Sequence, residues 1–232
     1  MGSYDLYVAS RASTSAPFSP PVSLVALNTS TWDSDPEISD DGLTLYYVKT
    51  PFCCSPEAIP GLDIYVASRP DTSAPFGAGV PLSEINTPDI AEFHPSLSSD
   101  ELTLYFASNR SPSLGSHDIW FATRADRSLP FDPPNPLTEV NSTGTDMDPT
   151  ITADGLTLYL VRTVGGDGNI NVSTRPDTVS PFSSPTPVTE VNSIDHDWNP
   201  SISADGNTLY FGSRFPAALM DYEVWVAYRC GP

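Results

Sequence analysis

Short stretches of alternating apolar and polar residues follow one another along this chain, and the same stretches return at regular intervals. One of them reads Pro-x-Ile/Leu-Ser/Thr, then a turn, then Thr-Leu-Tyr, and its copies begin at Pro36, Pro95, Pro149 and Pro200. Alternation with period two is typical of β-strands, and the Asp-Gly found in three of the turns is a hairpin signal. Each copy therefore predicts two strands, a and b. The copy with Asp100-Glu101 in its turn should tolerate the hairpin geometry less well, because glycine adopts positive φ without steric cost.

A second phrase, of the type Asp-Ile-Tyr-Val-Ala-Ser-Arg, occurs five times and predicts a strand c that is apolar on both faces. Its copies cover residues 5–11, 63–69, 118–124, 169–175 and 223–229. A fourth strand, d, is predicted at 22–27, 80–85, 136–140 and 187–191. Each d segment ends in an asparagine followed by Ser or Thr, which we interpret as a turn whose asparagine side chain bonds its own backbone.

Repeats of about this length that consist only of strands indicate an all-β fold, a β-propeller of four-stranded antiparallel blades. We expect one domain over 1–232, with repeats at about 1–30 (strands c and d only), 31–88, 89–142, 143–193 and 194–232 (strands a, b and c). Four blades are the simplest solution, the last being completed by the N-terminal d strand. The alternative is five blades, one of them incomplete.

The balance of 10 basic against 29 acidic residues gives a formal charge of -19. Such a chain repels nucleic-acid phosphates and anionic lipids, so neither nucleic acid nor the membrane is expected as a partner, and no apolar run reaches transmembrane length. The start of the chain carries no signal-peptide pattern, and we expect that any export signal has been removed. Cys53, Cys54 and Cys230 do not make a disulfide framework, and their redox state stays open.

The most suggestive chemistry lies just before strand a, which is the innermost strand of a propeller blade. A carboxylate always stands three residues before the proline, and a further oxygen or nitrogen ligand stands one residue before it. Converging carboxylates repel one another unless a cation neutralises them, and oxygen ligands suit Ca²⁺, whereas histidine admits a transition metal. We therefore predict a metal site at one mouth of the central channel, calcium being preferred. Its candidate ligands are Asp33, Asp35, Glu92, His94, Asp146, Asp148, Asp197 and Asn199.

A structural explanation competes with this metal site. Strand b ends at the same face and carries Lys49, Arg110, Arg162 or Arg214, each of which could pair with a carboxylate and leave no metal. The position three before the proline is the better partner for arginine, and the position one before it is the better candidate to face the channel axis. The three histidines, His94, His117 and His196, fall on this same face but belong to different blades.

The order Pro-x-Ile-Ser-x-Asp-Gly-x-Thr-Leu-Tyr-Phe, followed by Asp-Ile-Tyr-Val-Ala, resembles the TolB-type β-propeller repeat, as do Ser108 to Arg110 and Ser213-Arg214 at the end of strand b. The resemblance covers nearly the whole chain. It implies a periplasmic or extracellular protein that binds partners. Some members of the family are peptidases or sugar lyases, but no Gly-x-Ser-x-Gly motif is present here.

The function that we expect first is a non-enzymatic binding propeller, with a metal ion at the channel mouth and a protein or carbohydrate ligand at the loop face. No catalytic residues are assigned in this case. The alternative is a metal-dependent hydrolase or lyase, similar to propeller lactonases and sugar-acid lyases, with His94 or His196 as general base. A third possibility is an assembly module that forms oligomers by strand addition at its unpaired terminal strand.

Overall fold

The computed structural model describes residues 4–50, 61–214 and 223–229 of this chain. Within these residues every regular element is a β-strand, and none of them forms a helix long and apolar enough to span a membrane. Cys53, Cys54 and Cys230 lie outside the described residues, so their redox state stays open. By its internal contacts the chain divides into two compact units, Met1–Phe93 and His94–Pro232.

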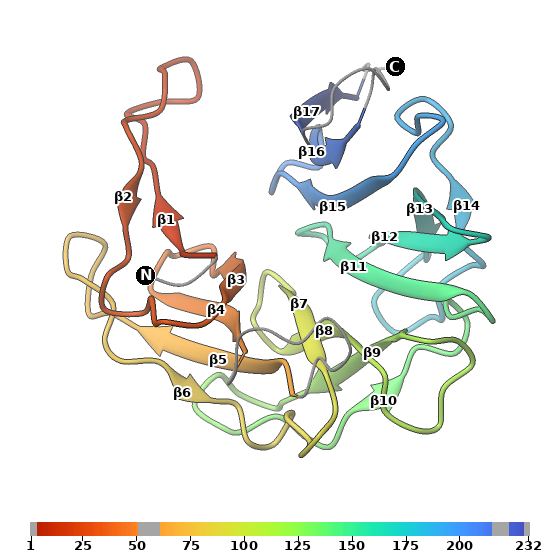
Figure 1. Cartoon of the computed structure of the whole chain (residues 1–232), viewed down its shortest axis with the longest axis horizontal. Coiled ribbons are helices and arrows are strands. Elements are labelled where there is room, and N and C mark those ends of the chain that lie inside the picture. Colours follow the sequence, from red (N-terminus) through yellow and green to blue (C-terminus); the bar gives the residue numbers. More distant parts are fainter. Residues whose placement is uncertain (1–3, 51–60, 215–222, 230–232) are drawn as a thin grey trace. The chain divides into compact units, whose positions relative to one another are not determined.

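The first unit contains a two-stranded and a four-stranded sheet, both antiparallel. Strands β1 (Tyr7–Val8) and β2 (Val22–Ser23) form the small sheet. Strands β3 (Asp33–Ile38), β4 (Thr44–Lys49), β5 (Asp63–Ser68) and β6 (Val80–Pro81) form the larger one in chain order, as Figure 1 shows. One apolar core joins the two sheets, consisting of Leu6, Leu27, Leu45, Tyr47, Ala67 and Phe76.

The second unit contains three further repeats (Figure 1). The first sheet has the order β7 (Glu92–Leu97), β8 (Thr103–Ser108), β9 (Asp118–Thr123) and β10 (Asn135–Pro136), β7 beginning two residues before the unit boundary. The second has the order β11 (Thr145–Ile151), β12 (Thr157–Val164), β13 (Asp167–Thr174) and β14 (Thr186–Pro187). The third consists of β15 (Asp197–Ile202), β16 (Thr208–Ser213) and β17 (Glu223–Tyr228). Apolar clusters lie between successive sheets, one of them around Leu158 and Leu160 and the next around Val161 and Phe211.

The turns between strands a and b have the geometry that the sequence predicts. Gly42, Gly155 and Gly206 all have φ near +70°. Glu101 takes the same position in the second repeat with φ of +59°, which is costly for a residue with a side chain. Its carboxylate is buried and pairs with Arg127 Nη1 at 3.0 Å, a contact that offsets part of this strain.

The d strands are shorter than predicted, because the chain turns after two strand residues. In the first complete repeat the N–H of Asn86 donates to the Leu82 carbonyl at 2.9 Å and closes that turn. The asparagine side chain does not bond its own turn, as we had interpreted it. Its Oδ1 accepts the N–H of Ile64 in strand c at 2.9 Å, and its Nδ2 donates to the carbonyl of the same residue at 2.9 Å. The same pair of bonds, always to a residue 22 positions earlier, is made by Asn28, Asn141 and Asn192.

The last repeat has fewer strands than the complete blades within the described residues. The N-terminal d strand, β2, pairs with β1 in the first unit, and its role in completing the final blade stays a prediction. The sheet of β15, β16 and β17 therefore has three strands within the described part of the chain, and β17 is its outer strand.

Candidate functional site

The carboxylates three residues before each proline lie inside strand a and not in the loop that precedes it. Asp33, Glu92 and Asp197 are the first residues of β3, β7 and β15, and Asp146 is the second residue of β11. All four side chains are buried. Strand a begins earlier than predicted because these residues already pair with the end of strand b, as Asp33 does with Lys49.

Each of these carboxylates closes the turn that leads into strand a. Asp146 Oδ2 accepts the backbone N–H of Ser142 at 2.6 Å and its hydroxyl at 2.8 Å. Asp33 makes the same pair of bonds with Thr29, and Asp197 makes them with Ser193. Glu92, which has a longer side chain, accepts the N–H of Thr87 at 3.1 Å, five residues away. Sequence reasoning missed this role, although the Asn-Ser/Thr pair before each carboxylate was its visible signal.

The predicted arginine pairing is confirmed in the third repeat. Arg162 Nε lies 2.7 Å from Asp146 Oδ1, and Arg162 Nη2 donates to the Val140 carbonyl at 2.5 Å. In the first repeat, by contrast, the Lys49 ammonium lies over the rings of Tyr47 and Tyr65, about 5 Å from each centroid. The carboxylate three residues before the proline thus makes a structural hydrogen bond or ion pair in every repeat.

In two other repeats, the oxygen that corresponds to Asp146 Oδ1 has no hydrogen-bond donor within the described residues. Asp33 Oδ1 and Asp197 Oδ1 are buried and find no hydrogen-bond partner within the described residues. A buried carboxylate oxygen without a donor is costly, since it has lost its water and gained nothing in exchange. At each of these two atoms, one in each unit, an added cation or water molecule would supply the missing partner.

The residues one position before each proline share an unusual backbone conformation. Asp35, His94, Asp148 and Asn199 all have positive φ, between +47° and +54°. In β3, β11 and β15 the pairing with strand b shifts register at this point, which is a β-bulge. A bulge turns a side chain out of the regular alternation of a strand and is frequent beside functional sites.

Three of these residues are linked directly, and we call them the pre-proline cluster: His94, Asp148 and Asn199. His94 Nδ1 is in contact with Asp148 Oδ1, and Asp148 Oδ2 accepts the backbone N–H of Asn199 at 2.9 Å. Asp148 thus joins strand a of three successive repeats, β7, β11 and β15. Its carboxylate is only 4% exposed, so these contacts are largely shielded from water. Asp35 has the same backbone conformation in the other unit.

The histidines occupy three different environments. Burial and the nearby His94 lower the pKa of His117, so that its ring is neutral near pH 7, and its Nδ1 lies 3.0 Å from Ser116 Oγ. His196 Nδ1 accepts the N–H of Gly168 at 2.9 Å. Among the residues that the structure describes, no group of three or more His, Cys, Asp or Glu side chains has the arrangement of metal ligands.

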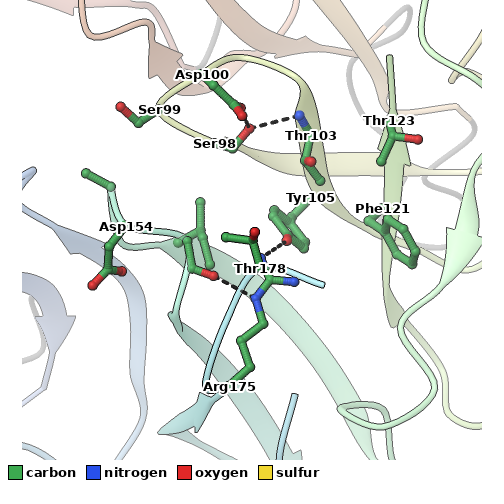
Figure 2. Close-up of a pocket in the computed structure, with 13 residues that line it drawn as sticks. Ser98, Ser99, Asp100, Thr103, Tyr105, Phe121, Thr123, Asp154, Arg175 and Thr178 are labelled. Carbon is green, nitrogen blue, oxygen red and sulfur yellow. Dashed lines mark hydrogen bonds between the residues drawn. The ribbon is translucent and has the colours of Figure 1, made fainter. Parts of the chain in front are cut away.

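A cavity of about 500 Å³ lies between the sheet of β7–β10 and that of β11–β14, and the sequence did not indicate it (Figure 2). Arg175 crosses it, donating from Nε to the Gly155 carbonyl at 2.7 Å and from Nη2 to Tyr105 Oη at 3.4 Å. The first of these bonds recurs in other repeats, from Arg69 to Gly42 and from Arg124 to Glu101. Arg175 therefore holds the turn between strands a and b, and the cavity is a groove between blades whose charged groups already serve the fold.

Comparison with known proteins establishes the fold and leaves the activity open. No protein-family model matches the chain, and no curated protein matches it. Among solved structures, TolB from Acinetobacter baumannii has a TM-score of 0.60 at 17% identity, and the match covers 90% of this chain and 43% of that one. A TolB protein from Agrobacterium tumefaciens has a TM-score of 0.58 at 19% identity, with 90% and 65% covered. An α-L-arabinofuranosidase from Lactobacillus brevis has a TM-score of 0.60 at 15% identity, with 85% and 73% covered.

The chain has an all-β propeller fold with four antiparallel blades. This confirms the fold class that the repeats predicted. The chain spans less than two thirds of the length of either TolB protein. At such identities the likeness is one of fold, because propellers with the same blades bind and transform unrelated molecules.

Proposed function

We propose that this chain is a non-enzymatic binding propeller of the TolB-type repeat family, with a divalent cation, preferably Ca²⁺, at the pre-proline cluster. The observation that carries the proposal is the Asp148 carboxylate, which is shared between His94 Nδ1 and the N–H of Asn199. Carboxylate and imidazole groups are ligands that divalent ions accept, and Asn199, which contacts Asp148 through its backbone N–H, offers an amide oxygen from the next repeat. Asp35, with the same bulge conformation, is the corresponding candidate ligand in the first unit.

Electrostatics supports a bound cation. The chain carries a formal charge of -19, and in the second unit the buried oxygen Asp197 Oδ1 finds no donor within the described residues. Attraction between opposite charges is stronger at sites shielded from water, so a cation there stabilises the folded chain more than a surface ion does. The carboxylates three residues before each proline already accept hydrogen bonds that close a turn. The residues one position before the proline are therefore the more suitable ligands for a cation.

The partner that we propose is a protein or a carbohydrate bound at the end of the propeller where strand a begins. Strand b ends there as well, since Asp197 pairs with Ser213 and Asp146 with Arg162. Loops on a rigid β scaffold are the usual place for binding residues. The TolB-type resemblance favours a periplasmic or extracellular location.

A thermal melt with and without chelator tests the cation. If a chelator lowers the melting temperature and Ca²⁺ restores it, the ion binds the folded state, which at 100 times Kd is stabilised by about 2.7 kcal/mol. Restoration by Mn²⁺ or Zn²⁺ alone would assign a transition metal through His94. Asp148→Asn should abolish the response to chelator. Asp154→Asn is the matched control, because the Asp154 carboxylate serves only the turn between strands a and b in the described contacts.

The variant Asp146→Asn distinguishes the stabilising effect of a bound cation from that of the Asp146–Arg162 ion pair. This variant should be less stable with and without chelator, by about 3–5 kcal/mol, because it leaves Arg162 without its buried partner. The response to chelator should persist. If no ion and no chelator changes the melt of the unaltered protein, the cation proposal is wrong, and Asp148 acts only as the partner of His94 and Asn199.

A metal-dependent hydrolase or lyase is the second candidate, and the His94–Asp148 contact is the observation in its favour. A carboxylate beside an imidazole can hold that ring in place as a general base. Two assays test this, both in the presence of the ion that restores the melting temperature. One measures hydrolysis of lactones, and the other measures formation of unsaturated products from uronate oligomers. Activity that disappears in His94→Gln, with the melting response to the ion retained, would favour the enzyme over the binding module.

A further inference from the structure

The cavity between the sheets of β7–β10 and β11–β14 lies wholly within the second unit, since every residue that lines it falls between Ser98 and Thr178. Two turns between strands a and b contribute to its lining, through Asp100 and Asp154. The cavity is therefore at the end of the blades where strand a finishes, whereas the partner proposed above binds where strand a begins. Its volume of about 500 Å³ falls within the range of small-molecule sites.

One wall of the cavity is a patch of four side chains on a single face of the β7–β10 sheet. In the neighbouring strands β8 and β9, Thr103 pairs with Thr123 and Tyr105 pairs with Phe121. Side chains two positions apart point to the same face, so the two hydroxyls lie beside the two rings (Figure 2). The ring centroids are 6.4 Å apart. Within the described residues, neither threonine hydroxyl makes a hydrogen bond, so both can serve a ligand.

Phe121 is the member of this patch that the repeat does not explain. Its ring is partly buried and helps to line the cavity. The corresponding position of the other four strands c is always valine, at Val8, Val66, Val172 and Val226. The blade itself does not require a ring here, because the other copies form their strand without one. The aromatic surface is thus a property of this one cavity.

The guanidinium of Arg175 crosses the cavity and keeps one unused group. Its Nε and Nη2 are held by the two bonds described above. Its Nη1 makes no hydrogen bond within the described residues, whereas Arg69 Nη1 donates to the Thr72 carbonyl at 3.2 Å. The arginine of the second repeat, Arg124, has the Glu101 carboxylate 3.7 Å from its Nη2. Arg175 therefore offers a fixed donor to a ligand in the cavity.

The charges around the cavity favour a neutral ligand. The exposed carboxylates of Asp100 and Asp154 stand against the single guanidinium of Arg175. A small anion is repelled by the two carboxylates, and a small cation is repelled by the guanidinium. A neutral molecule rich in hydroxyl groups meets neither penalty, because each hydroxyl can donate and accept hydrogen bonds.

We propose that this cavity binds a neutral sugar ring, a hexose or pentose that is free or terminal in an oligosaccharide. The apolar face of the ring lies against Phe121. Its hydroxyls exchange hydrogen bonds with Thr103, Thr123 and Arg175 Nη1. Small-molecule sites typically combine aromatic surface with a few placed polar groups in this way. The inference goes beyond the proposed function and is independent of the cation at the pre-proline cluster.

Saturation-transfer NMR tests the site on the unaltered protein. The neutral probes are the methyl glycosides of glucose, galactose, mannose, xylose and arabinose, and the charged probes are glucuronic acid and alanine. We expect transfer to the C–H protons of at least one neutral glycoside, with a Kd on the order of 1 mM, the affinity usual for a ligand of this size. Glucuronic acid should bind more weakly, because its carboxylate meets Asp100 and Asp154.

Three variants locate the bound sugar. Phe121→Val installs the residue of the other strands c, so the blade should still fold, and it should weaken binding about tenfold. Thr123→Val removes one exposed hydroxyl and should weaken binding about threefold to tenfold. Phe18→Val is the matched control, because it makes the same exchange at an exposed ring of the first unit and should leave binding unchanged. If Phe121→Val fails to fold, Thr123→Val decides the matter.

Three outcomes would overturn the proposal. The first is the absence of transfer to every neutral glycoside. The second is equal binding by Thr123→Val, Phe121→Val and the unaltered protein; loss of that binding in His94→Gln would then assign the sugar to the end where strand a begins, in support of the proposed function alone. The third is tighter binding of glucuronic acid or alanine than of any neutral glycoside, which would make the ligand a charged one.

Discussion

Replacing Asn141 by alanine should destabilise the protein, because this side chain fastens the end of a d segment to strand c. Asn141 Oδ1 accepts the N–H of Ile119 at 2.7 Å, and Asn141 Nδ2 donates to the Ile119 carbonyl at 2.9 Å. The carbonyl also accepts the N–H of Leu137 at 2.9 Å, so it keeps one partner in the variant. The N–H of Ile119, a fully buried residue, loses its acceptor.

The expected size follows from these contacts. A buried N–H left without an acceptor costs about 1–3 kcal/mol, and the second hydrogen bond contributes about 0.5–1.5 kcal/mol. We therefore expect the free energy of unfolding to fall by roughly 2–4 kcal/mol. For a chain of this size each 1 kcal/mol lowers the melting temperature by about 2–4 °C, so the melting temperature should fall by roughly 5–15 °C.

Urea unfolding followed by tryptophan fluorescence measures this change, with thermal melting as the second readout. Asn135→Ala is the matched control, because the exposed Asn135 side chain donates only to the Pro133 carbonyl, at 3.2 Å, among the described contacts. That variant should stay within about 0.5 kcal/mol of the unaltered protein. Equal unfolding midpoints for the two variants would refute the reasoning, since the two bonds of Asn141 to Ile119 would then contribute nothing to the stability of the blade.

Three further predictions concern the packing and charge of single repeats. Gly79→Ala should destabilise the protein by about 1–3 kcal/mol in urea unfolding, because the added methyl group would overlap the Tyr47 phenol in a closely packed position. Gly155→Ala should cost about 1–2 kcal/mol in the same assay, since its φ of +68° disfavours any side chain; an unchanged midpoint would mean that the turn relaxes. Hydrogen bonds from the Thr152 hydroxyl and from backbone N–H groups lower the pKa of Asp154, so this carboxylate stabilises the fold above its unfolded-state pKa and loses that contribution as pH falls through the lower, folded-state pKa. An NMR titration of the Asp154 carboxyl carbon should give a pKa below the ordinary value, and Thr152→Val should raise it towards that value.

The sequence was sufficient for the fold class and for the order of the strands, because the pattern of each repeat is local. The Asp-Gly turns, the Thr-Leu-Tyr strands and the five c strands are visible without tertiary information, and the sheets follow them in chain order. The sequence also indicated that the turn containing Glu101 is the least favourable of the four. The compensating contact of Glu101 with Arg127 was not predicted, because that arginine lies 26 residues further along the chain.

The candidate site was harder to predict, since its residues act across turns and between repeats. The sequence favoured arginine as the partner of carboxylates such as Asp146 and favoured the channel axis for the residues two positions later, but it listed both positions as candidate ligands. The structure separates the two sets: Asp146 is committed to Ser142 and Arg162, whereas Asp148 reaches His94 and Asn199 in the adjoining repeats. Spacing in the sequence cannot distinguish a carboxylate that closes a turn from one that reaches a neighbouring repeat, because both recur with the same period. The bulge that separates them is a backbone property.

The constant separation of 22 residues between each asparagine and its strand c partner has a consequence for how such chains diversify. Strand c and the d segment form a module of fixed length, so differences in repeat length must arise elsewhere. They fall mostly in the connection from strand b to strand c, which is only two residues between Val164 and Asp167 and nine between Ser108 and Asp118. This connection lies at the end of the blade where strand a begins. New recognition loops can therefore be grafted there, and the Val164–Asp167 turn is the natural first position for an engineered insertion.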